Sequence, residues 1–261
     1  MSDSAPTIDF GRTAKDYGRY RPGFPADFFA RMASRGIGVA GQRVLDLGTG
    51  TGSLGRGFAR RGCPVTGLDP SAALIAQARG LDREEELQTE YVQAYAESTG
   101  LPSGSFDVVT AGTCWHWFER SRAAAEARRV LRPNGVLVIA HFDWLPLPGS
   151  VVEAAEALIL THNPAWTMAG GCGIHWRWFA DLERAGFLAI ESFSFDVDQS
   201  YSHEAWRGRI RASAGVAASL DADAVARFDA EHALLLAERF PGEPLLAPHR
   251  VFALMGRVRA S

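Results

Sequence analysis

The sequence predicts an α/β fold built on a doubly wound parallel sheet, and three observations support this prediction. Short apolar runs alternate with helical segments between residues 44 and 141. A glycine-rich turn joins the first apolar run to the helix that follows it. The 261 residues, of which 47% are hydrophobic and 22% charged, suffice for one large globular domain with a buried core.

The first half of the chain contains five predicted strands, each an apolar run that ends near a turn signal. These strands cover residues 44–47, 64–68, 91–94, 106–111 and 136–140. Helices are expected over 53–61, 72–79 and 121–131. Ser71 is the expected cap of the second helix. The charged residues 82–86 indicate a solvated loop or helix end, and residues 132–135 indicate a turn.

The pattern changes after residue 141, where helical segments predominate. Helices are expected over 151–160, 176–185, 202–212 and 221–239, and strands over 187–197 and 250–258. No repeat or low-complexity linker separates these segments from the first half. We therefore expect a single domain, residues 1–261. Its core is expected over about 25–144, 187–197 and 250–258, and a helical lid or substrate cap over about 145–186 and 202–247.

Composition excludes several classes of partner. The formal net charge is −3, which offers no electrostatic footprint for nucleic acid or for an anionic membrane. Residues 1–10 lack the basic start and apolar run of a signal peptide, and no apolar run is long enough to span a bilayer. The three cysteines are far apart and have no C-x-x-C spacing, as is typical of a reducing compartment. These features favour a cytoplasmic protein without a zinc site.

Lys15 is the only lysine in the chain. A phosphate-loop lysine, a pyridoxal Schiff base and the Tyr-x-x-x-Lys pair of short-chain dehydrogenases each need a lysine after a glycine loop or deep in a site. The sequence offers no lysine for any of these roles.

The segment from Asp46 to Gly52, Asp-Leu-Gly-Thr-Gly-Thr-Gly, lies where a strand turns into a helix. Its glycines let the backbone approach a nucleotide-like ligand, although Gly50-x-Gly52-x-x-Gly55 also satisfies the dinucleotide pattern. The acidic residues favour another ligand. Asp46 precedes the glycines, where it would not help a pyrophosphate but suits an ammonium group, and Asp69 ends the second strand, where a carboxylate can accept two ribose hydroxyls.

These residues resemble the class I S-adenosylmethionine-dependent methyltransferases, in particular the small-molecule branch built on a type 11 methyltransferase domain. The resemblance begins at the leader Tyr-Gly-Arg-Tyr-Arg-Pro-Gly-Phe-Pro, residues 17–25, and extends to about residue 141. Its further motifs are the glycine segment, 67–71, 96–102, 105–109, His-Trp-Phe at 116–118 and 131–135. The resemblance implies a seven-stranded Rossmann-like methyltransferase sheet and S-adenosylmethionine as cofactor, with S-adenosylhomocysteine as product.

The resemblance also implies which residues contact the cofactor. The methionine portion is assigned to Gly48, Thr49 and Gly50; the ribose and adenine to Asp69 and Pro70; the adenine edge to Ala96 and Glu97; the sulfonium to Thr113; and the cofactor's carboxylate to Tyr20 and Arg21. Two positions depart from the family pattern: Tyr95 replaces a frequent aspartate, and Thr113 a frequent glutamine.

Methyl transfer requires positioning in a closed, dry site and requires no metal. A hydroxyl or carbon nucleophile can need a base, and His141 and His116, after the fifth and fourth strands, are the candidate catalytic bases. His175 is a third possibility. Trp144, His175 and Trp176 are the candidate substrate contacts in the part of the chain expected to cover the acceptor.

We therefore expect O-, N- or C-methylation of a small molecule, with an aromatic or apolar metabolite as one option, and neither nucleic acid nor membrane as partner. Two alternatives remain open. One is an NAD(P)-dependent oxidoreductase, motivated by the dinucleotide-like glycines. The other is a non-catalytic protein that binds the cofactor, because methyl transfer leaves no obligatory catalytic residue to look for.

Overall fold

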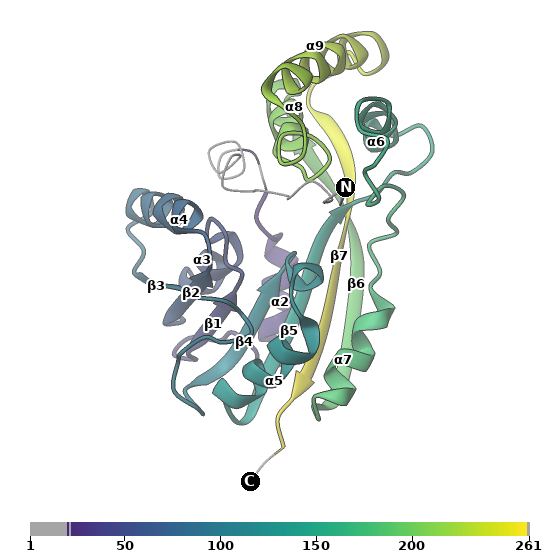
Figure 1. The fold of residues 1–261 in the computed structure, drawn as a ribbon. Coiled ribbons are helices and arrows are strands. Elements are labelled where there is room, and N and C mark those ends of the chain that lie inside the picture. Colours follow the sequence, from purple (N-terminus) through teal and green to yellow (C-terminus); the bar gives the residue numbers. More distant parts are fainter. Residues whose placement is uncertain (1–19, 21, 260–261) are drawn as a thin grey trace, which may run out of the picture. The chain divides into compact units, whose positions relative to one another are not determined.

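The computed structural model describes residue 20 and residues 22–259, which divide into two compact units. The sheet unit contains residues 22–142, 174–195 and 251–259. The helical unit contains residue 20 and residues 143–173 and 196–250. Figure 1 shows the strands and helices that make up each unit. Among the residues described, no helix has the length and apolar composition that a membrane crossing needs.

Seven strands form one sheet in the order β3-β2-β1-β4-β5-β7-β6 (Figure 1). Strand β1 pairs in parallel with β2 and β4, β2 with β3, and β4 with β5. The strands are β1 Val44–Leu47, β2 Val65–Asp69, β3 Thr89–Gln93, β4 Phe106–Gly112, β5 Leu131–Trp144, β6 Leu188–Tyr201 and β7 Leu245–Arg257. The prediction of a doubly wound, seven-stranded sheet is confirmed.

Helices follow the strands much as the hydrophobic spacing predicts. Those of the sheet unit are α2 Ala26–Ala33, α3 Ser53–Ala59, α4 Ala72–Glu84, η2 Trp115–Trp117, α5 Arg120–Val130, η3 Trp176–Trp178 and α7 Phe179–Arg184. Those of the helical unit are α6 Val151–His162, α8 His203–Arg211 and α9 Ala222–Arg239. Ser71 caps α4 by accepting a hydrogen bond from the Leu74 amide. Asp221 caps α9 in the same way through the Ala224 amide.

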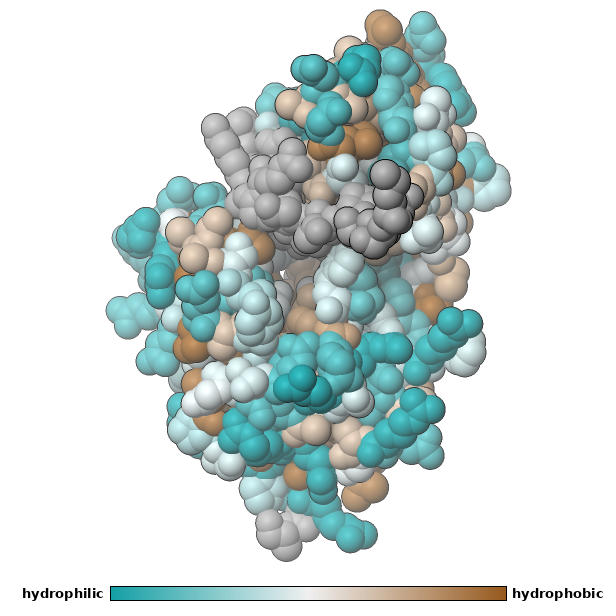
Figure 2. Space-filling model, viewed as in Figure 1, coloured by the Kyte–Doolittle hydropathy of each residue, from teal (hydrophilic) through white to brown (hydrophobic). Residues whose placement is uncertain are grey.

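The sheet-unit core joins the apolar strands to alanines on one side of α5, among them Ala123 and Ala127. The opposite side of α5 carries arginines, and Figure 2 shows mainly hydrophilic side chains over this region. Leu182 of α7 belongs to the same core, and the Trp115 indole donates to Asp181 at 3.1 Å. These contacts join α7 to η2 and to the core that also contains the α5 alanines, so residues 174–186 belong to the sheet unit and not to the lid expected over 145–186.

The helical unit has its own aromatic core. Trp206 of α8 and Phe228 of α9 are fully buried, together with Ile159 of α6. Arg211 of α8 donates to Asp229 of α9 at 2.7 Å, an ion pair that joins these two helices. Helices α6, α8 and α9 therefore pack around one apolar centre, whereas the helix expected over 176–185 contributes Leu182 to the core of the sheet unit.

Two local expectations differ from the structure. The turn predicted at residues 132–135 is an excursion inside β5: Leu131 pairs with Phe106 and Val136 with Val108, so four residues lie outside the register. Asn134 adopts a positive φ of 64° there, which suits its short side chain. In addition, α4 extends beyond residue 79 and ends at residue 84, as the alternative of a helix end at residues 82–86 predicts. Asp82 is nevertheless buried and forms an ion pair with Arg56, so it is not solvated.

Two glycine substitutions test the packing of α2 on α3. Gly57→Ala should lower the free energy of unfolding by roughly 1–3 kcal/mol, because overpacking a filled core forces neighbouring atoms apart. A Cβ at Gly57 would lie 2.0 Å from Cζ of Phe29. The control, Gly80→Ala in α4, meets no atom closer than 4.0 Å and should raise the free energy of unfolding by roughly 0.5–1 kcal/mol through helix propensity. Urea unfolding measures both changes, and a loss of stability in both variants would contradict this packing.

Candidate functional site

The glycine loop, residues 48–52, follows β1 at the point where the sheet order reverses between β1 and β4. Ligands of open α/β sheets bind at such a switch point. Gly48, Gly50 and Gly52 all have positive φ, at 60°, 56° and 80°. A Cβ at Gly48 would also lie 2.9 Å from Sγ of Cys114. Only glycine allows this tight turn to lie so close to the segment after β4.

Asp69, at the end of β2, holds the glycine loop in place. Its Oδ2 accepts a hydrogen bond from the Gly50 amide at 2.9 Å, and its Oδ1 accepts one from the Ser71 amide at 2.9 Å. Burial raises the pKa of Asp69 above its usual value, against the effect of these two donors. The carboxylate therefore links β2, the loop and the start of α4, and each oxygen keeps a lone pair for a ligand. Pro70 follows, and its carbonyl accepts from Gln93 at 3.0 Å.

Asp46 is buried beneath the loop and is hydrogen-bonded by two hydroxyls. Thr49 donates to its Oδ2 at 2.7 Å, and Thr110 of β4 donates to its Oδ1 at 2.7 Å. Burial raises the pKa of Asp46 from 3.8 to about 6, despite these donors. The sequence analysis did not predict that Thr110 contacts Asp46. A hydroxyl in an otherwise apolar strand was the available signal, and the strand register pairs Thr110 directly with Asp46. The contact predicted between Asp46 and an ammonium group stays a prediction.

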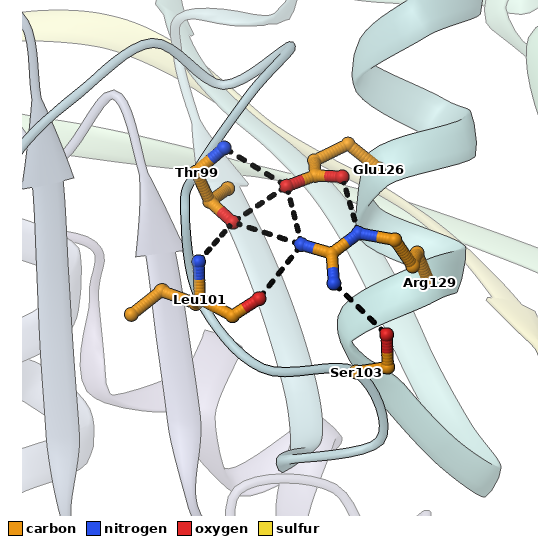
Figure 3. Close-up of polar contacts among 5 residues, drawn as sticks. All are labelled: Thr99, Leu101, Ser103, Glu126 and Arg129. Carbon is orange, nitrogen blue, oxygen red and sulfur yellow. Dashed lines mark hydrogen bonds and ion pairs between the residues drawn. The ribbon is translucent and has the colours of Figure 1, made fainter.

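Ala96 and Glu97 lie in the segment between β3 and β4, which a polar network fixes to α5 (Figure 3). Glu126 accepts from the Thr99 amide at 2.8 Å and from its hydroxyl at 2.6 Å. Arg129 binds Glu126 through two nitrogens, each at 2.7 Å, and donates to the Leu101 carbonyl at 2.8 Å and the Ser103 hydroxyl at 2.9 Å.

This network fixes the charge of one carboxyl and the position of another. The hydrogen bonds from Arg129 hold the pKa of Glu126 at about 2, so its carboxylate stays charged over the whole neutral range. Glu97 is half-buried, and its Oε1 accepts from the Glu119 amide at 2.8 Å. Both ends of α5 therefore help to set the position of the predicted adenine contacts.

Thr113 follows β4 with a φ of 57°, a left-handed conformation that is strained for a β-branched residue. Its amide donates to the Ala140 carbonyl of β5 at 2.8 Å, which holds the strained turn against the neighbouring strand. Strain of this kind is concentrated at functional sites, and Thr113 is the residue that the family resemblance assigns to the sulfonium.

Three histidines come together beyond the carboxyl end of β4, where His141 of β5 follows Ala140, the partner of the last β4 residue. The ring centroids of His116 and His141 are 5.3 Å apart, and those of His141 and His175 are 4.3 Å apart. His141 is buried, whereas the other two are partly exposed. Trp178 stacks on His175 at 4.0 Å with an interplanar angle of 2°, a contact that the sequence analysis did not predict. The three candidate bases thus form one cluster, defined here as the histidine cluster.

Four other predicted site residues are in the helical unit, exposed on the sheet unit, or outside the described residues. The Tyr20 hydroxyl donates to Glu204 at 2.8 Å within the helical unit, and Arg21 lies outside the described residues. Trp144 also belongs to the helical unit, and Trp176 is 67% exposed. Their predicted contacts with cofactor or acceptor stay predictions.

Parts of this chain resemble known proteins. Residues 45–139 match the family model described as a methyltransferase domain. An uncharacterized methyltransferase of Mycobacterium tuberculosis is 35% identical over 131 residues, which cover 50% of this chain and 51% of the relative. The chain thus spans about half the length of the mycobacterial relatives that it matches.

Two further proteins match over more of the chain. A ubiquinone biosynthesis O-methyltransferase of Xanthomonas oryzae is 29% identical over 68% of this chain and 73% of the relative. The fold is similar to that of a phosphoethanolamine N-methyltransferase of Haemonchus contortus, solved in complex with phosphomonomethylethanolamine and S-adenosylhomocysteine. That comparison has a TM-score of 0.58 at 17% identity and covers 100% of this chain and 62% of the other.

The raised pKa of Asp46 predicts how stability depends on pH. Below about pH 4 the Asp46 carboxyl is protonated in both the folded and the unfolded chain. Between about pH 4 and 6 it ionises only in the unfolded chain, so this group lowers the free energy of unfolding as pH rises. Its full contribution is about 3 kcal/mol. Asp46→Asn cannot ionise, so its free energy of unfolding relative to the native chain should rise by about that amount between pH 4 and pH 7.

Denaturant unfolding at four pH values across this range measures the difference. Asp27→Asn is the control, because it removes a carboxylate that is exposed in the first turn of α2. If the difference in free energy of unfolding between the native chain and Asp46→Asn stayed constant from pH 4 to pH 7, the Asp46 carboxyl would ionise alike in the folded and the unfolded chain.

Proposed function

We propose that this chain, a member of the class I methyltransferase family by its matching domain and its sheet order, transfers a methyl group from S-adenosylmethionine to a small-molecule acceptor. The observation that carries the proposal is the glycine loop at the β1/β4 switch point, held by the Asp69 carboxylate through the Gly50 amide. The loop offers a backbone surface to a nucleoside, and the carboxylate beside it offers acceptor atoms to a ribose.

The donors and acceptors around the loop suit S-adenosylmethionine. Each oxygen of Asp69 has one amide donor and can accept a further hydrogen bond, which matches a pair of ribose hydroxyls. The proposed contacts are Gly48, Thr49 and Gly50 with the methionine portion, Pro70 with the adenosine, Ala96 and Glu97 with the adenine edge, Thr113 with the sulfonium, Asp46 with the ammonium, and Tyr20 and Arg21 with the carboxylate.

S-adenosylmethionine supplies an electrophilic methyl group on a positively charged sulfur. In the transfer, the carbon–sulfur bond breaks as the methyl carbon bonds to the acceptor atom, and the acceptor's proton must leave. We assign that proton to an imidazole nitrogen of His141, with His116 as the alternative base, because both lie at the carboxyl edge where the glycine loop also ends. His175, stacked on Trp178, borders His141 and is the proposed substrate contact from the histidine cluster.

The acceptor class that we propose is a planar hydroxyl compound. A hydroxyl nucleophile must lose a proton, which gives the histidine cluster a chemical role, and the stacked pair of His175 and Trp178 is suited to a flat ring. The ubiquinone biosynthesis O-methyltransferase relative supports oxygen as the methylated atom.

The alternative oxidoreductase function is disfavoured by the sheet. Dinucleotide-binding sheets have the order 3-2-1-4-5-6, whereas here β7 lies between β5 and β6. A protein that binds the cofactor without catalysis is the other alternative, and turnover distinguishes it from an enzyme.

Calorimetric titration tests the cofactor first. S-adenosylmethionine and S-adenosylhomocysteine should bind saturably, whereas NAD and NADP should not. Asp69→Ala should weaken binding by more than tenfold, or about 1.4 kcal/mol, because the ribose loses its acceptor. Asp27→Ala, which removes an exposed carboxylate of α2, should bind as the native chain does. Saturable binding of a dinucleotide, or native affinity in Asp69→Ala, would refute this assignment.

Turnover tests the base. His141→Gln should slow the release of S-adenosylhomocysteine at least tenfold with a panel of phenols and catechols, and should leave cofactor affinity unchanged. His162→Gln is the control, since that imidazole binds Glu231 at 3.0 Å in the helical unit. Native turnover in His141→Gln would remove this residue from the base role, and cofactor binding without turnover across the whole panel would favour the non-catalytic alternative.

A further inference from the structure

A groove of about 500 Å³ lies at the amino edge of the sheet, and we propose that it binds a small polyanion carrying at least two phosphate groups. Three arginines line it: Arg43, Arg79 and Arg83. Neither the family match nor the proposed function assigns a role to this groove.

The position of the groove separates it from the cofactor site. Its lining includes the residues that precede or begin four strands: Arg43 before β1, Pro64 before β2, Thr89 of β3 and Phe106 of β4. These strands run parallel, so their starts share one edge, and the glycine loop lies at the opposite edge. Asp69 is four residues along β2 from Val65, which corresponds to roughly 13 Å at the rise of a strand.

Two carboxylates at or near the groove are bound to other groups. Asp82 forms an ion pair with Arg56 and accepts from the Tyr91 hydroxyl at 2.8 Å. Asp107, beside Arg43, accepts from the Arg132 guanidinium at 2.8 Å and from the Arg43 backbone amide at 2.7 Å.

By contrast, no carboxylate within residues 20 and 22–259 forms an ion pair with the side chains of Arg43, Arg79 or Arg83. Glu90 is the remaining carboxylate in the lining. The groove therefore presents an excess of positive charge, which favours an anionic ligand.

Aromatic rings orient two of these arginines. The Arg43 guanidinium lies 5.4 Å from the centre of the Phe106 ring, and that of Arg79 lies 5.9 Å from the centre of the Tyr91 ring. Arg79 also donates to the Tyr91 carbonyl at 3.3 Å. A guanidinium that packs on a ring keeps N–H donors at its edge, where phosphate oxygens can accept two parallel hydrogen bonds.

The size of the groove sets the size of the ligand. A volume of about 500 Å³ lies in the range of small-molecule sites and is far more than one phosphate ion needs. Phe106 and Val65 are buried and give the lining an apolar part. The three guanidiniums come from two segments, Arg43 before β1 and Arg79 and Arg83 one turn apart on α4. A ligand with two phosphates can contact both segments, so the ligand class is a diphosphate or a small organic molecule with two phosphates.

Isothermal titration with inorganic pyrophosphate tests the proposal on the whole chain. The native protein should bind one pyrophosphate saturably, and Arg43→Gln/Arg83→Gln should weaken binding at least tenfold. The matched control, Arg122→Gln/Arg128→Gln, removes two exposed arginines of α5 and should change affinity less than twofold. Asp69→Ala should also bind pyrophosphate as the native chain does, whatever it does to the cofactor, because it alters the opposite edge.

Melting temperatures within a few degrees of the native value establish that both double variants are folded. The proposal is wrong if the native chain gives no saturable heat, or if both double variants weaken binding equally, which would indicate nonspecific charge attraction. Loss of pyrophosphate binding in Asp69→Ala would place the anion at the glycine loop instead. Citrate that binds as tightly as pyrophosphate would overturn the assignment to phosphate.

Discussion

Two buried carboxylates at the ends of neighbouring strands hold the glycine loop, and the candidate site depends on them. Asp46 accepts hydrogen bonds from the Thr49 hydroxyl of the loop and from the Thr110 hydroxyl of β4. Asp69 accepts a hydrogen bond from the Gly50 amide of the loop. Both carboxylates carry an energetic cost, since burial raises the pKa of each. These hydrogen bonds hold the loop in a conformation with positive φ angles at its glycines, and at Gly48 there is also no room for a Cβ.

The sheet was predictable from sequence because its strands are short apolar runs that end at glycine or aspartate, as β1 and β2 do. The excursion at residues 132–135 was not, because a Pro-Asn-Gly signal marks a turn whether it lies between two strands or inside one. Asp82 appeared solvated in a charged run, and only the fold brings Arg56 beside it from 26 positions away.

The candidate site was predictable to a different degree in its two halves. The cofactor half is local in sequence, so Gly50 and Asp69 could be named from one motif and one strand end. The histidine cluster gathers residues from three separate segments, and the contact of His175 with His141 follows from the position of η3 beside β5, which no local pattern encodes. For the same reason, no local pattern predicts that Trp178 stacks on His175.

The place of β7 in the sheet has a consequence for how the protein is made. A ribosome completes β6 more than 40 residues before β7, yet β7 lies between β5 and β6. Until residues 245–257 emerge, β5 has an unpaired edge, and β6 has no place beside it. Open strand edges invite pairing with other chains. A chain cut short before β7 would thus lose more than one strand, because the two strands that β7 separates would be left as templates for aggregation.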